Sequence, residues 1–266
     1  MKKYLIHFIA LLIIGCTSLQ SDKQTIKSGM PERANTFFQY NIWGAFVNRV
    51  FDGSMTVKEL KTKGDIGLGS FDMLDGELVM LDGITYRIRE DGSVSVGDNS
   101  DEIVYADATF FKQDNQYEMN EEVNFEGLRK VLNNQLPSPN NFYAFKIIGE
   151  FESIKLGGLH KQKAPFEKGL DYLIPNRPVF TGKKIKGTMI GFYCPTFIGD
   201  INAAGFHFHF ISDDKKLGGH VMEMEIKATN ALKVSRQKLV NYEFKLPESE
   251  AFETVKFDKQ FQYNKK

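Results

Sequence analysis

Short apolar runs separated by turn residues dominate the second quarter of the chain and predict an antiparallel sheet there. Three Asp-Gly pairs end these runs, at residues 75–76, 82–83 and 91–92. Asp-Gly is typical of two-residue hairpin turns, because glycine adopts the positive φ that such turns require. We therefore expect residues 64–96 to form a meander of antiparallel strands.

Helical patterns are few and short. Thr56 and Glu59 have the spacing of a capping box, which predicts a short helix that ends at Gly64. Asn120, followed by two glutamates, predicts the start of a second helix, which ends before Pro137.

Longer strands are predicted in the second half of the chain. The apolar runs there place strands at residues 142–154, 186–193, 205–211 and 219–229, with a short helix at 165–173. Pro137 and Pro139 stand among polar residues and mark the best candidate for a domain boundary. The predicted fold class is α+β (mixed α/β), with two sheet-rich domains at residues 35–137 and 138–266, mostly antiparallel or mixed sheets, and few short helices.

Composition supports a folded protein and excludes several classes. The 266 residues are 42% hydrophobic and 26% charged, which is the balance of a globular protein with a buried core. This excludes a disordered tail, a collagen-like fibre and a protein with several membrane spans. Lys plus Arg equals Asp plus Glu, at 34 each, so no net charge attracts nucleic acid, and we expect no nucleic-acid partner.

The N-terminal segment has the pattern of an export signal. Two lysines precede an apolar run at residues 4–14, which is too short to span a bilayer comfortably. The run leads into Gly15 and Cys16, which look like the cleavage box of bacterial lipoproteins. We expect residues 1–15 to be a lipoprotein signal peptide, Cys16 to carry the lipid, and residues 16–34 to be a tether. The protein would then be exported, and lipid-anchored to the periplasmic or extracellular face of a bacterial membrane; a plain secretory signal is the alternative.

Cys194 is the remaining thiol once Cys16 is acylated, so no intrachain disulfide is expected. It lies between Tyr193 and Pro195, in a setting typical of a buried strand end. We interpret it as an inert core cysteine, with a catalytic thiol as the alternative.

Three of the five histidines lie within fourteen residues and are candidate metal ligands. On a strand, His207 and His209 point to one face and the intervening phenylalanines to the other. A polar loop at residues 212–217 would return the chain antiparallel and set His220 beside the pair. Three converging imidazoles form an open site of the kind that holds Zn²⁺ and leaves a position for water or substrate. The alternative is a pair of exposed strand histidines with a third nearby by chance.

Long stretches of both halves resemble the α-acetolactate decarboxylase family. The stretches that carry the resemblance lie at residues 64–71, 74–78, 81–83, 187–192, 205–211 and 218–221. The similarity runs from about Gln39 to Pro247. It implies a two-domain α/β protein, commonly a homodimer, that converts the small-molecule substrate 2-acetolactate to acetoin and carbon dioxide.

The resemblance also implies roles for particular residues. The zinc ligands of the family correspond to His207, His209 and His220, the residues already selected by their spacing. An active-site carboxylate of the family corresponds to Glu77, and a threonine near the substrate corresponds to Ser70. From the pattern alone, Glu77 would be interpreted as an exposed carboxylate at the start of a strand.

The expected chemistry suits these groups. Loss of carbon dioxide from a β-keto acid leaves an enediolate, whose negative charge a zinc ion stabilises as a Lewis acid. A positioned acid must then deliver a proton to carbon, and Glu77 is the candidate.

The chain departs from the family pattern in two places. The family arginine on the strand before Lys161 falls on Gly157, which has no charge; Lys155, His160 or Lys161 would have to replace it. On this basis, an arginine restored at position 157 is expected to raise turnover. The family also has a C-terminal carboxylate near the metal, and residues 262–266 contain no matching glutamate.

Two classes of function therefore stay open at the level of sequence. The first is a zinc-dependent acetolactate decarboxylase, a carbon–carbon lyase. The second is a non-catalytic zinc-containing lipoprotein that binds a small keto or hydroxy acid, because Gly157 stands at the arginine position.

Overall fold

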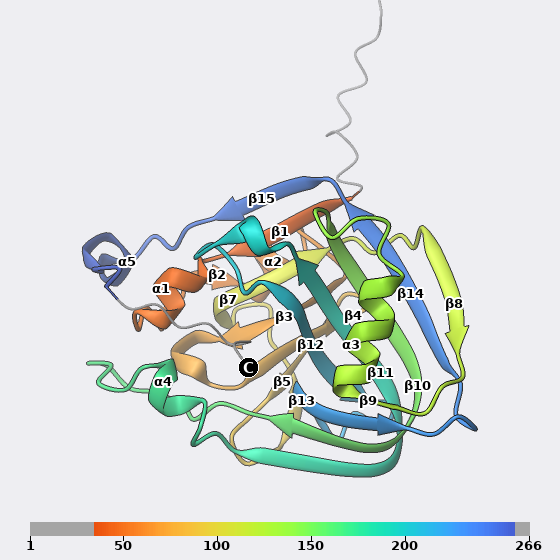
Figure 1. The fold of residues 1–266 in the computed structure, drawn as a ribbon. Helices are drawn as coiled ribbons and strands as arrows, with labels where there is room; N and C mark the ends of the chain where they lie inside the picture. The colour runs from red at the N-terminus through yellow and green to blue at the C-terminus, as the bar shows by residue number, and fades with distance from the viewer. Residues whose placement is uncertain (1–34, 259–266) are drawn as a thin grey trace, which may run out of the picture. The chain divides into compact units, whose positions relative to one another are not determined.

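Two sheets form the body of the protein in a computed structural model that describes residues 35–258 (Figure 1). The predicted signal peptide at residues 1–15, the lipidated Cys16, the tether at 16–34 and the end of the chain at 259–266 lie outside the described residues. Within the described part of the chain, no helix has the length and apolar character needed to cross a membrane.

The first sheet has the strand order β15-β1-β7-β3-β4-β5-β6, with β2 paired to β7. Its strands are β1 Thr36–Tyr40, β2 Met55–Thr56, β3 Ile66–Phe71, β4 Glu77–Leu81, β5 Ile84–Ile88, β6 Val94–Val96, β7 Glu102–Thr109 and β15 Asn241–Lys245. Neighbours are antiparallel except β1 and β15. The predicted meander is confirmed as β3 to β6, and Gly76, Gly83 and Gly92 at its turns all have positive φ.

The second sheet has the order β8-β14-β10-β11-β12-β13-β9. Its strands are β8 Asn115–Met119, β9 Val123–Asn124, β10 Phe142–Gly157, β11 Val179–Cys194, β12 Gly205–Ser212, β13 Gly218–Ile226 and β14 Leu232–Leu239. The distal end of β10 also pairs with β13, so β10 to β13 close on themselves. The four strands predicted in this half are confirmed, and β10 and β11 are longer than predicted.

The helices are short, as predicted, but two begin later than expected. They are α1 Trp43–Val47, α2 Val57–Leu60, α3 Phe125–Asn134, α4 Leu170–Leu173 and α5 Glu250–Thr254, with 3-10 turns at Asp72–Leu74 and Thr196–Ile198. The cap at Thr56 is confirmed, since its hydroxyl accepts from the Glu59 amide at 3.2 Å. The predicted helix start at Asn120 is wrong, because β9 is extended and Asn124 caps α3 instead. The helix predicted at residues 165–173 is reduced to α4.

The two sheets do not divide at the prolines near residue 137. The elements β8, β9 and α3 precede Pro137 yet belong to the second sheet or pack on it, and β15 returns from the C-terminal half to pair with β1. The described residues lie within a single compact unit. The domain limits 35–137 and 138–266 stay a prediction.

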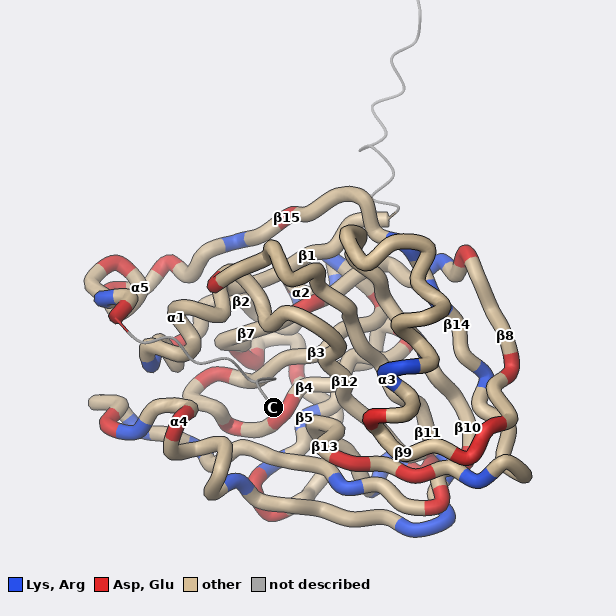
Figure 2. The backbone as a smooth tube through the Cα atoms, in the orientation of Figure 1, with Lys and Arg blue, Asp and Glu red and all other residues tan. Residues whose placement is uncertain are grey.

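The alternation along β12 organises the core and the site together. Phe208 and Phe210 point into the core of the second sheet, where Phe210 meets Phe151 edge to face at 5.4 Å between ring centroids. Helix α3 covers this cluster with Leu128 and Leu132. Charged residues of both signs are interspersed along the outer strands and loops (Figure 2), in keeping with the balanced composition. The opposite face of β12 carries the histidines.

Candidate active site

The hairpin of β12 and β13 brings the three predicted histidines together. His207 and His209 share one face of β12, and the strand register places His209 directly opposite His220. The return requires glycine at residue 219, where φ is 138° and a Cβ would lie 2.8 Å from the carbonyl oxygen of Gly157. The predicted convergence is therefore confirmed as geometry.

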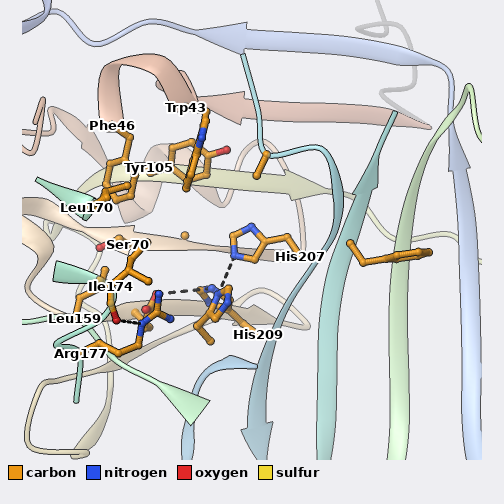
Figure 3. Close-up of a pocket in the computed structure, with 15 residues that line it drawn as sticks. Trp43, Phe46, Ser70, Tyr105, Leu159, Leu170, Ile174, Arg177, His207 and His209 are labelled. Atoms are coloured by element: carbon orange, nitrogen blue, oxygen red, sulfur yellow. Dashed lines mark hydrogen bonds and ion pairs between the residues drawn. The ribbon is translucent and has the colours of Figure 1, made fainter. Parts of the chain in front are cut away.

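The three rings form one compact cluster, of which Figure 3 labels His207 and His209. Their centroids are 4.9 to 5.3 Å apart, and one nitrogen from each ring lies within 4.8 Å of the others. Nε2 of His207 is 3.1 Å from Nδ1 of His220. Nδ1 of His209 lies 2.8 Å from the carbonyl oxygen of Leu78. A proton on that nitrogen, donated to the carbonyl, leaves Nε2 free to act as a ligand, which is the usual arrangement of a metal-binding histidine.

Burial keeps these imidazoles uncharged. It lowers the pKa of His207 to about 4, with a smaller contribution from the positive charge of Arg177. It lowers the pKa of His209 and His220 well below 6.5, and the neighbouring histidines add to the effect. Neutral imidazole is the form that binds metal. Three neutral nitrogen donors at this spacing fit a divalent metal ion with an open coordination position.

Glu77 lies beside the histidines and is buried, contrary to the interpretation of it as an exposed strand-start residue. Its side chain is only 6% exposed, and Oε2 is 3.7 Å from Nε2 of His209. Burial raises the pKa of Glu77 to about 8, although Arg177 acts in the opposite direction. A carboxyl group with a pKa close to neutrality is suited to accept and return a proton.

Ser70 faces Glu77 across the β3–β4 pair. Its hydroxyl is buried and lies within hydrogen-bonding distance of two backbone carbonyls, at 3.2 Å from Gly76 and 3.3 Å from Phe71. Both residues line the same pocket as the histidines. The structure therefore brings together all the predicted site residues in the described part of the chain.

The pocket has walls that the sequence did not indicate. Its cavity volume is about 60 Å³. Apolar and aromatic side chains form most of its wall, namely Trp43, Phe46, Tyr105, Leu159, Leu170, Ile174, Ala203 and Phe206. Apart from Phe206 on β12, they come from α1, β7, α4 and loops far apart in the chain, so local pattern does not group them with the histidines. A wall of this kind excludes water around a small ligand.

Arg177 is the functional candidate that sequence reasoning missed. It lies between α4 and β11, is 9% exposed and lines the pocket, and its Nε donates to the carbonyl of Ile174 at 3.1 Å. The cations considered from sequence lie elsewhere. Lys155 pairs with Glu223, His160 lies 3.0 Å from Glu90 and Lys161 pairs with Asp75, and none of the three lines the pocket.

Cys194 lies at the end of β11, outside the pocket lining. It is a free, buried thiol, and burial raises its pKa well above the ordinary value, so the reactive thiolate is disfavoured. This agrees with an inert core residue.

We expect Glu77→Gln to stabilise the metal-free protein, and the gain to grow between about pH 4.5 and pH 8. Below this range the carboxyl is neutral in both the folded and the unfolded chain. As pH rises through it, the unfolded chain releases its proton while the buried carboxyl resists, so the parent loses stability that glutamine retains. The gain is at most about 1.4 kcal/mol per unit of pH. Urea unfolding with a chelator at pH 5 and pH 8 measures it, and an equal gain at both values contradicts it.

Comparison with known proteins identifies the family. A model of the alpha-acetolactate decarboxylase family matches residues 37–259. The alpha-acetolactate decarboxylase of Bacillus licheniformis is 32% identical over 239 residues, covering 90% of this chain and 93% of that protein. The one of Brevibacillus brevis is 33% identical over 222 residues, covering 84% and 76%. The crystal structure of alpha-acetolactate decarboxylase from Bacillus subtilis strain 168 superposes with a TM-score of 0.80 at 29% identity, covering 84% of this chain and 94% of that one. Together with the histidine cluster, these matches show that the chain belongs to the alpha-acetolactate decarboxylase family.

Proposed function

We propose that this protein is a zinc-dependent decarboxylase that converts 2-acetolactate to acetoin and carbon dioxide. The observation that carries the proposal is a cluster of three neutral histidines, His207 partly buried and the other two buried, beside a carboxyl group whose pKa is near neutrality. Family membership supports the substrate, since the relatives named above are alpha-acetolactate decarboxylases.

Each group in the pocket has a separate role in the proposed reaction. Zinc held by His207, His209 and His220 would supply a Lewis acid that stabilises negative charge on substrate oxygens. Glu77 holds its proton near neutral pH and can deliver it to the carbanionic centre that remains after carbon dioxide leaves. The aromatic wall keeps bulk water away, which strengthens the electrostatic interactions inside the pocket.

Acetoin formation from 2-acetolactate by the purified, zinc-loaded chain tests the proposal. We expect turnover well above the uncatalysed rate, and we expect Glu77→Gln to lower it about 10²- to 10⁴-fold, because a positioned acid–base group typically contributes that much. A parent without turnover overturns the proposal and favours the non-catalytic zinc lipoprotein. A fully active Glu77→Gln variant removes Glu77 from the mechanism.

Metal content tests the ligand assignment independently of activity. We expect one zinc per chain in the parent and almost none in the His207→Ala/His209→Ala double variant, because one imidazole does not hold the ion. His160→Ala is the matched control, since His160 is an exposed histidine next to Glu90. Undiminished zinc in the double variant contradicts the assignment.

We also propose that the chain is exported and anchored by a lipid on Cys16. The basic and apolar pattern of residues 1–15 and the position of the cysteine support this. Cys16→Ser should move the protein from the membrane fraction to the soluble fraction of its bacterial host. A parent found in the soluble fraction contradicts the anchor.

A further inference from the structure

Gly157 and Arg177 share one volume at the wall of the pocket. A Cβ built on Gly157 would lie 2.5 Å from Cδ and 2.6 Å from Nη1 of Arg177. Real Cβ atoms do not approach other atoms so closely. A side chain at position 157 therefore requires the side chain of Arg177 to shift from its observed position.

Lack of room for a side chain, and not the backbone conformation, accounts for the glycine at position 157. The φ angle of Gly157 lies outside the left-handed region that favours glycine. Gly157 stands at the end of β10, opposite His220 of β13, and directly opposed residues in an antiparallel pair project to the same face. A side chain at 157 would thus extend toward the histidines, into the volume that Arg177 fills from the turn before β11.

Arg177 has the placement and the charge to recognise an anion in this pocket. Of the pocket-lining residues in the described ranges, it alone carries a permanent positive charge, since the histidines are neutral. Its hydrogen bond to Ile174 fixes the guanidinium stem. Its charge also contributes to the pKa shifts of Glu77 and all three histidines, which places the guanidinium within electrostatic reach of the whole cluster.

We propose that Arg177 binds the carboxylate of the substrate in this protein, in place of the arginine that the family pattern puts at position 157. The inference rests on the proposed decarboxylation, in which the substrate is a hydroxy-keto carboxylate. A guanidinium is the side chain best suited to this task, because its planar donors match the two oxygens of a carboxylate. On this proposal, the turn between α4 and β11 supplies the positive charge of the pocket in place of strand β10.

This geometry reverses the expectation for an arginine restored at position 157. With Arg177 in its observed position, the Cβ introduced by Gly157→Arg would collide with the side chain of Arg177. We expect the single variant to gain no activity and to melt at a lower temperature than the parent. The Gly157→Arg/Arg177→Ala double variant should recover melting temperature, because alanine removes the colliding atoms.

Removing the arginine at position 177 and introducing one at position 157 tests the proposal directly. Arg177→Ala should lower kcat/KM for 2-acetolactate about 10- to 100-fold, which is the effect expected for one charge-assisted hydrogen-bonding group. Adding Gly157→Arg to Arg177→Ala should raise kcat/KM again by at least about tenfold. Gly158→Arg in the same background is the matched control, because its Cβ would face Phe180 and Pro178 instead of Arg177, and it should restore nothing.

Binding provides a readout that does not depend on turnover. The probe is 2,3-dihydroxy-2-methylbutanoate, which keeps the carboxylate of 2-acetolactate but has no ketone to permit decarboxylation. Calorimetry on the zinc-loaded proteins should show about 10- to 100-fold weaker binding of this probe to Arg177→Ala than to the parent. Binding of acetoin, which has no carboxylate, should be unchanged.

The outcomes separate this inference from the proposed function. An Arg177→Ala variant with parental kcat/KM and probe affinity, with zinc content and melting temperature intact, overturns the role of Arg177 and leaves the decarboxylase proposal standing. An equal loss of affinity for probe and acetoin also overturns it, because that indicates a general disturbance of the pocket. A parent without turnover that binds the probe through Arg177 overturns the proposed function and supports carboxylate recognition by Arg177.

Discussion

The pairing of β12 with β13 is the constraint on which the site depends. It sets His209 opposite His220 while the phenylalanines of β12 point into the core. A slip of one residue would turn the imidazoles toward the core and expose Phe208 and Phe210. Burial of the phenylalanine face of β12 therefore fixes the register in which β12 pairs with β13. The same packing that stabilises the second sheet also holds the histidines in place.

Burial then determines the charge states around that hairpin. The same low-dielectric surroundings lower the pKa of the histidines and raise the pKa of Glu77, so the cluster sits in the fold mostly uncharged. Neutral groups cost little to bury beside one another. They are also the states that the proposed chemistry needs, because a metal ligand must be a neutral imidazole and an acid must hold its proton. Arg177 is the charged exception among the residues that line the pocket.

Sequence reasoning succeeded where the information is local. Asp-Gly turns defined the meander, and the alternation through His207 and His209 with a short polar return defined the hairpin. It failed where the outcome depends on contacts between distant segments. Helix α3 begins later than predicted because the residues before it form β9, which pairs with β13. The boundary predicted at Pro137 does not separate the sheets, because β15 from the C-terminal half pairs with β1. The pocket walls on α1 and α4 have no local pattern that connects them with the histidines.

Arg177 shows the same limit at the level of a single residue. Twenty positions separate it from Gly157, but the register of β10 with β11 places Gly157 opposite Val179, two residues beyond Arg177. The resemblance to the family implies an arginine at position 157, whereas the structure places the guanidinium of Arg177 beside Gly157. A Cβ at position 157 would overlap the side chain of Arg177, so the glycine permits the observed position of Arg177. On the proposal that Arg177 binds the substrate carboxylate, the departure from the family pattern at residue 157 is one half of a paired change and not the loss of a function.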